Sequence, residues 1–133
     1  MGSDADVRIV EQFLADFNRH RLMRLIRLTR ADLSIQLPDG TTAQGRLATG
    51  RLIAWVLRCS RGTLRMTPLS VAADGDGEVI ARTHNAARRG KSKLALEMVL
   101  VFTVRDGRIS AIRESVEDLA AWNLFWRSAA ASH

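Results

Sequence analysis

The stretch Leu94–Asp118, LALEMVLVFTVRDGRISAIRESVED, decides the fold of this chain. Its apolar residues recur at every second position before Arg105-Asp106-Gly107 and resume after these three residues. A period of two is typical of a β-strand with one apolar face, and an Asp-Gly pair is typical of a hairpin turn. The stretch therefore predicts two antiparallel strands whose apolar positions are Leu94, Leu96, Met98, Leu100, Phe102 and Val104 in the first, and Ile109, Ile112 and Val116 in the second.

The length of the hairpin loop decides which side chains share a face. A two-residue Asp-Gly loop pairs Val104 with Ile109 and turns Arg113 toward the apolar face. A three-residue loop, with Gly107 at positive φ and a bulge beside it, pairs Val104 with Arg108 instead. We prefer the three-residue loop because a guanidinium group is hard to bury among apolar side chains.

The three-residue loop turns Glu114 inward, together with Ile112 and Val116. These three residues are then expected beside Leu100, Met98 and Leu96. Glu114 becomes a single carboxylate in an otherwise apolar wall, and burial of this kind should raise its pKa toward neutrality. Such a group suits general acid-base catalysis.

The rest of the chain predicts helices packed on this sheet. Helical spacing or capping residues predict helices over 4–19, 22–28, 49–60 and 119–127, with Thr49 and Asp118 as caps of the last two. Alternation predicts strands over 33–37, 64–73 and 78–88, with Pro68 at an edge or a bulge. The fold class is α+β, a single domain over 1–133 with N-terminal helices on a curved antiparallel sheet that encloses a pocket, and a short C-terminal helix.

Composition limits the classes of protein that this chain can represent. The 133 residues are 47% hydrophobic and 26% charged, which is typical of a globular domain. Cys59 is the only cysteine, so there is no internal disulfide and a reducing cytoplasm is expected. We expect neither a signal peptide nor a membrane span.

The net charge of +6 is spread along the chain. All basic residues except Lys91 and Lys93 are arginine, with local clusters over 19–30 and 88–93. Nucleic-acid interfaces usually gather their basic residues on one face and interleave stacking aromatics. We therefore expect most of the arginines to be solvated, and we expect no specific nucleic-acid binding.

Several motifs resemble the SnoaL-like branch of the nuclear transport factor 2-like superfamily. They are Val101-Phe102-Thr103-Val104-Arg105-Asp106-Gly107-Arg108-Ile109, the closing Arg113-Glu114-Ser115-Val116-Glu117-Asp118, and Gly45 with Leu52-Ile53-Ala54-Trp55. The resemblance implies a cone with one pocket between the sheet and the helices, often in a dimer. The superfamily includes polyketide cyclases, ketosteroid isomerases, epoxide hydrolases and non-catalytic binding proteins.

The limonene-epoxide-hydrolase-like members offer a comparison residue by residue. Their active site uses an Arg-x-Asp pair on one strand and an Asp on the closing strand, and here Arg82-Thr83-His84 and Glu114 fall at similar positions. Gln36 falls at the position of the family's Asn, and Ser34 replaces its Tyr. The His in place of Asp and the missing Tyr depart from the pattern of that reaction.

Glu114, Arg82 and His84 are accordingly the candidate catalytic residues, provided that the alternation brings them together. Glu114 would be the acid or base, Arg82 would position and tune it, and His84 would assist or hold a substrate oxygen. The alternative is a buried Arg82–Glu114 ion pair that only fixes the core. The candidate substrate-binding residues are Gln36 and Ser34, which could also face solvent, and the apolar Leu96, Met98, Leu100, Phe102, Ile112 and Val116.

The sequence thus predicts an enzyme that acts on a hydrophobic, polyketide- or terpenoid-like molecule by cofactor-free acid-base chemistry. Cyclisation, isomerisation and epoxide opening all fit. The alternative is a non-catalytic module that binds a hydrophobic ligand or a partner protein. We expect no metal, because His20, His84 and His133 lack the spacing of ligands. A homodimer is expected through the outer face of the sheet, where Ala95, Val99 and Val101 lie.

Overall fold

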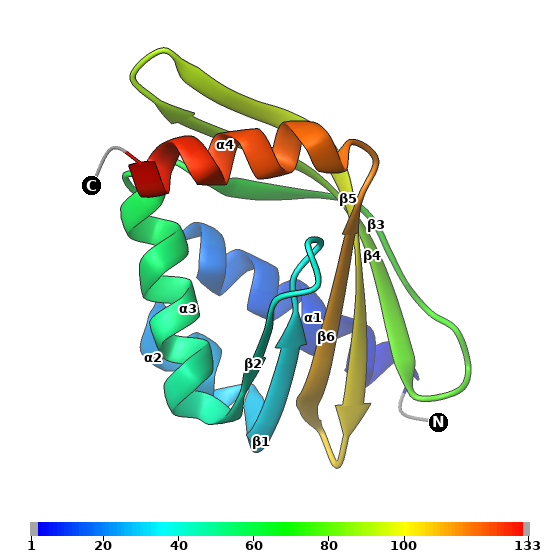
Figure 1. Cartoon of the computed structure of the whole chain (residues 1–133). Helices are drawn as coiled ribbons and strands as arrows, with labels where there is room; N and C mark the ends of the chain where they lie inside the picture. The colour runs from blue at the N-terminus through cyan, green and yellow to red at the C-terminus, as the bar shows by residue number, and fades with distance from the viewer. Residues whose placement is uncertain (1–2, 132–133) are drawn as a thin grey trace.

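The computed structural model describes residues 3–131 of the chain (Figure 1). The helices are α1 (Ser3–Asn18), α2 (Leu22–Arg27), α3 (Gly45–Cys59) and α4 (Leu119–Ala131). The strands are β1 (Thr29–Gln36), β2 (Thr42–Gln44), β3 (Arg65–Ala73), β4 (Glu78–Arg89), β5 (Ser92–Arg105) and β6 (Arg108–Val116). The α+β class with helices packed against a curved sheet is confirmed.

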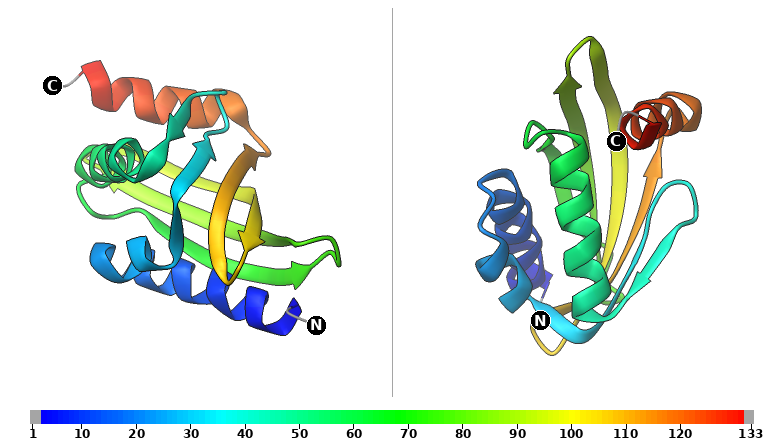
Figure 2. Two further views of the ribbon diagram at one scale, coloured as in Figure 1. Left: turned by 90° about the horizontal axis from the view of Figure 1, so that it is seen from below. Right: turned by 60° about the vertical axis from the view of Figure 1, so that its left-hand side comes forward.

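The six strands form one sheet in the order β2-β1-β6-β5-β4-β3. The predicted meander β3–β6 is antiparallel throughout, but β1 pairs with β6 in parallel. The expectation of a wholly antiparallel sheet is therefore wrong at this one pair. The sheet curves around α1 and α3, and α4 crosses its end near α3 (Figure 1 and Figure 2).

The β5–β6 turn has two residues rather than the predicted three. Asp106 and Gly107 both have positive φ, 52° and 75°, as in a tight hairpin turn, and Val104 pairs with Ile109. The prediction of a three-residue loop is wrong because Asp106 accepts the left-handed conformation that we assigned to Gly107 alone.

A bulge in β6 nevertheless turns Glu114 inward. Thr103 pairs with Ala111 while Val104 pairs with Ile109, so Ser110 is an extra residue in β6. Its hydroxyl donates to the Thr103 carbonyl oxygen at 3.2 Å. One added residue reverses the alternation, so Glu114 lies opposite Leu100 and Arg113 faces outward.

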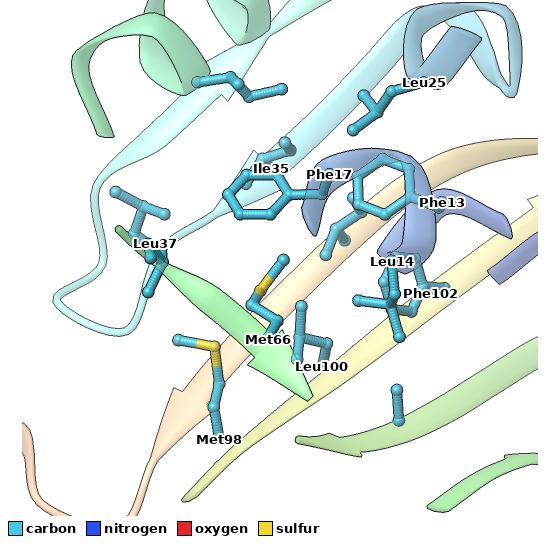
Figure 3. Close-up of a cluster of buried hydrophobic side chains, with 14 of the residues drawn as sticks. Phe13, Leu14, Phe17, Leu25, Ile35, Leu37, Met66, Met98, Leu100 and Phe102 are labelled. Carbon is cyan, nitrogen blue, oxygen red and sulfur yellow. The ribbon is translucent and has the colours of Figure 1, made fainter. Parts of the chain in front are cut away.

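The hydrophobic core fills the space between the helices and the concave face of the sheet. Phe13, Leu14 and Phe17 of α1 lie against the side chains of β5 (Figure 3). The ring of Phe13 meets that of Phe102 edge to face, with centroids 5.4 Å apart. This packing follows from the apolar stripes of α1 and β5.

Two predicted helix starts have different outcomes. Asp118 accepts a hydrogen bond from the Ala121 backbone at 3.0 Å, so its capping of α4 is confirmed. Thr49 is not a cap, because α3 already begins at Gly45, directly after β2, and Thr49 is buried inside the helix. The short strand β2 that precedes α3 was not predicted.

Arg89 joins the end of α3 and the middle of α4 to the sheet. It is buried, and its Nη1 and Nη2 donate to the carbonyl oxygens of Cys59 at 2.9 Å and Phe125 at 3.0 Å. The guanidinium also lies 4.5 Å from the centroid of the Phe125 ring. Arg89 is therefore a structural residue, not part of a solvated basic cluster as its sequence neighbours suggested.

Candidate functional site

A narrow cavity of about 50 Å³ lies between the helices and the concave face of the sheet. Its walls are aliphatic and aromatic side chains from α1, α3, α4, β3, β5, β6 and the end of β1. Several of them are labelled in Figure 3, including Phe17, Met66 and Leu100. Only two of the residues that line the cavity are polar, namely Asn85 and Glu114.

Glu114 reaches this cavity from β6, between Ile112 and Val116 along the strand and opposite Leu100. Its side chain is partly buried, and among the side chains that the structure describes, those of residues 4–127, none forms an ion pair or hydrogen bond with its carboxyl group. Burial in these apolar surroundings raises the pKa of Glu114 to about 8. The carboxyl group is thus mostly protonated at pH 7 and can both donate and accept a proton.

Asn85 reaches the cavity from β4 and is 1% exposed. Its Nδ2 donates to Thr83 Oγ1 at 3.2 Å, and Thr83 Oγ1 donates to the Met98 carbonyl oxygen at 3.4 Å. The remaining atom, Asn85 Oδ1, has no partner among the described residues. The cavity thus holds a hydrogen-bond acceptor as well as an acid.

A wider groove of about 510 Å³ adjoins the cavity between α3, α4 and the turn after β1. Four residues, Leu37, Leu52, Val56 and Trp122, line both spaces. The groove is further lined by Trp55 and Trp126, whose rings lie 5.5 Å apart. The small inner cavity and the larger groove therefore adjoin each other, with these four side chains between them, and the groove has tryptophan side chains in its wall.

Arg82 and His84 do not join Glu114. Both side chains are exposed on the outer face of β4, where Arg82 Nη2 lies 2.6 Å from Glu97 Oε1. The inward positions of this strand are Val79, Ala81, Thr83, Asn85, Ala87 and Arg89. The predicted convergence of Arg82, His84 and Glu114 is wrong, and so is the alternative Arg82–Glu114 ion pair. The reason is that the odd-numbered residues of β4 face inward, so the even-numbered Arg82 and His84 face outward.

Ser34 and Gln36 lie on the opposite face of β1 from Leu33, Ile35 and Leu37. Gln36 is exposed and Ser34 is partly exposed, and neither lines the cavity. Of the two possibilities left open for them, the structure supports the solvent-facing one.

The apolar wall predicted from β5 and β6 divides into two groups. Met98, Leu100 and Ile112 line the cavity. Leu96 and Phe102 are buried in the core without lining it, and Val116 is partly buried beside Glu114. The prediction that all six form the wall holds for three of them.

Two further features bear on the type of site. Among residues 3–131, no group of three His, Cys, Asp or Glu side chains could hold a metal ion, and His133 lies outside this range. The described helices include none that is long and apolar enough to cross a membrane.

Known proteins share this architecture. An uncharacterized protein of Mycobacterium tuberculosis is 32% identical over 134 residues, covering 95% of this chain and 99% of that protein. The structure of Bal32a, from a soil-derived mobile gene cassette, matches with a TM-score of 0.91 at 28% identity, covering 96% of this chain and all of that one. An LEH-like epoxide hydrolase of M. tuberculosis matches with a TM-score of 0.74 at 22% identity, covering 99% and 96% of the two chains.

The family follows from the sequence itself. The pattern of the SnoaL-like domain matches residues 10–112, which span helix α1 to the middle of the closing strand β6. This range includes most of the hairpin from which the fold was predicted, and the structural neighbours share the curved sheet and its helices. The chain belongs to the SnoaL-like domain family.

Proposed function

We propose that this protein is an enzyme that acts on a small hydrophobic molecule by cofactor-free acid-base chemistry, with Glu114 as the acid and base. One observation carries the proposal: a carboxyl group that has no counter-ion in the described part of the chain faces an apolar cavity. A structural carboxylate would instead be expected to have hydrogen-bond or charged partners, because an unpaired buried charge is costly.

The protonation state of Glu114 fits proton transfer at neutral pH. With a pKa of about 8, roughly nine-tenths of the carboxyl groups are protonated at pH 7. The acid can protonate a carbonyl, epoxide or alkoxide oxygen, and the carboxylate can then take a proton from carbon, hydroxyl or water. Isomerisation, cyclisation and epoxide opening each need a proton to be donated and another to be accepted. The structural likeness to an LEH-like epoxide hydrolase is consistent with epoxide opening.

The cavity and the adjoining groove, which share four lining residues, support a hydrophobic substrate larger than the cavity. About 50 Å³ accommodates a reacting group with its nearest atoms, whereas the groove of about 510 Å³ accommodates a ring system. Trp55, Trp122 and Trp126 line the groove and offer aromatic surfaces to such a ring system. We propose that the body of the substrate lies in the groove and its reacting end passes Trp122 to reach Glu114.

Turnover of the Glu114→Gln variant tests the proposal. A panel of a terpene epoxide, an unsaturated ketosteroid and an aromatic poly-β-ketone ester would first identify a substrate of the wild-type protein. Gln keeps the volume of Glu but cannot exchange a proton, so turnover should fall about a hundredfold or more. Glu117→Gln is the matched control, because Glu117 is exposed on the same chain segment, and its turnover should stay within about twofold of wild type.

Two results would contradict the acid-base role. In the first, Glu114→Gln retains full turnover, which would show that another residue performs the acid-base chemistry. Alternatively, the wild-type protein could turn over none of the panel while native mass spectrometry shows a small molecule retained through purification. That second result would favour a binding module over an enzyme.

We also propose a homodimer through the outer face of the sheet. Val99 and Val101 are partly exposed at the centre of this face, and Ala95 and Ile80 are exposed beside them. Apolar side chains at the centre of a sheet favour association with a second sheet. Light scattering at micromolar concentration should give the wild-type protein twice the chain mass of 14.8 kDa. The Val101→Glu variant should give the mass of a single chain. A wild-type mass of one chain would contradict the dimer.

A further inference from the structure

We propose that the substrate carries a second polar group, a hydroxyl or an N–H, that donates a hydrogen bond to Asn85 Oδ1. This inference rests on the proposed function, because it describes the molecule on which Glu114 acts. It assigns the substrate to a chemical class: an apolar skeleton with a reacting oxygen function at one point and a hydrogen-bond donor at another.

The orientation of the Asn85 side chain is fixed by its neighbours. The Thr83 hydroxyl has one hydrogen, which it donates to the Met98 carbonyl oxygen at 3.4 Å. Toward Asn85 the hydroxyl oxygen can therefore only accept, and it accepts from Nδ2 at 3.2 Å. The amide thus places its oxygen, and not its nitrogen, at the position without a partner.

A buried carbonyl oxygen without a partner lowers the stability of the protein that contains it. Asn85 is 1% exposed, and its neighbours along the inward face of β4 are Thr83 on one side and the apolar Ala87 on the other. Glu114 is the other polar residue of the cavity lining. A polar group of this kind discriminates strongly between ligands, because a ligand without a donor leaves the oxygen unpaired in the complex as well.

The position of Asn85 relative to Glu114 sets the spacing of the two polar groups. Asn85 lies opposite Leu96 of β5 and Glu114 lies opposite Leu100, on the two strands that flank β5. Leu96 and Leu100 are four residues apart, which is about 13 Å along an extended strand. The two side chains thus reach the cavity from well-separated backbone positions on different strands, so the hydrogen-bond donor of the ligand is a group distinct from its reacting oxygen.

A matched pair of probes tests the inference without the natural substrate. 2-Naphthol and 2-methylnaphthalene have the same ring system and a substituent of similar size, but only the former donates a hydrogen bond. Equilibrium dialysis should show that the wild-type protein binds 2-naphthol roughly tenfold more tightly than 2-methylnaphthalene. Asn85→Leu should lose this preference, whereas Leu94→Met, which changes a buried apolar residue outside the cavity lining, should keep it.

Thermal unfolding of the same variant provides a second readout. If Asn85 Oδ1 is unpaired in the free protein, Asn85→Leu should raise the melting temperature by roughly 3–6 °C. The inference is overturned if 2-naphthol does not bind, if its preference persists in Asn85→Leu, or if this variant melts below wild type. Turnover of Glu114→Gln tests the catalytic role, whereas the 2-naphthol preference of Asn85→Leu tests the recognition role, so a failure of one is distinguishable from a failure of the other.

Discussion

Between pH 5 and pH 8, the wild-type protein should lose about 3 kcal/mol of its free energy of unfolding relative to the Glu114→Gln variant. Burial raises the pKa of Glu114 from its ordinary 4.5 to about 8 in the folded protein. Between these values the folded protein holds one proton more than the unfolded chain. The stabilisation is therefore complete below pH 4.5 and is lost as the pH rises through about 8.

Urea unfolding of both proteins at pH 5 and pH 8 measures this effect. All other titrating groups are shared, so the difference between the two proteins isolates Glu114. The Glu117→Gln variant is the control for removing an exposed carboxylate from the same chain segment. If wild type and Glu114→Gln keep a constant difference across this range, the carboxyl group is ionised in the folded protein.

Replacing Arg89 by Met should lower the free energy of unfolding by about 2–4 kcal/mol. Met keeps much of the length and the apolar surface of the side chain but donates no hydrogen bond. The carbonyl oxygens of Cys59 and Phe125 would each lose a charge-assisted hydrogen bond, and the contact of the cation with the Phe125 ring would be lost. Because these bonds hold the end of α3 and the middle of α4, α4 should become more accessible to proteolysis.

Arg88→Met is the matched control for this experiment. Arg88 is the exposed neighbour of Arg89 on the opposite face of β4. Its replacement should change the free energy of unfolding by no more than about 0.5 kcal/mol. Equal effects at the two positions would show that the buried guanidinium does not hold the helices to the sheet.

The sequence allowed the α+β class, the β3–β6 meander and most helices to be predicted, because these elements have clear apolar periods. The inward position of Glu114 was predicted from a wrong turn. The structure combines a two-residue turn with a bulge at Ser110. Shortening the turn by one residue and adding one residue at the bulge each shift the alternation of β6, so the two changes cancel and Glu114 still faces inward. The three-residue spacing of Ile109 and Ile112, which are both buried, is the sequence signal for that bulge.

The candidate site was predicted less well than the fold, and β4 explains why. The inward-facing positions of β4 include the small or polar residues Ala81, Thr83 and Asn85, so the alternation of apolar and polar residues is weaker in β4 than in β5. The comparison with an Arg-x-Asp pair then favoured Arg82 and His84, one position away from Thr83 and Asn85. If the inward positions of β4 had been assigned from the apolar Val79 and Ala87, Asn85 would have been identified as an inward-facing residue.

Other features depend on contacts between distant parts of the chain. The parallel pairing of β1 with β6 joins residues 77 to 80 positions apart in sequence, and β2 has only three residues. The role of Arg89 requires two helix carbonyl oxygens that the fold brings together. Local periodicity contains no information on such contacts.

The pKa of the Glu114 side chain, measured by carbon-13 NMR, is the most direct test of the acid-base role. The side-chain carboxyl carbons of uniformly labelled Glu residues would be followed from pH 4 to pH 10, and the Glu114 signal identified by its absence in Glu114→Gln. We expect a single titration with a midpoint of about 8. A midpoint near the ordinary value of 4.5 would show an ionised, solvated carboxylate and would contradict the proposed catalytic site.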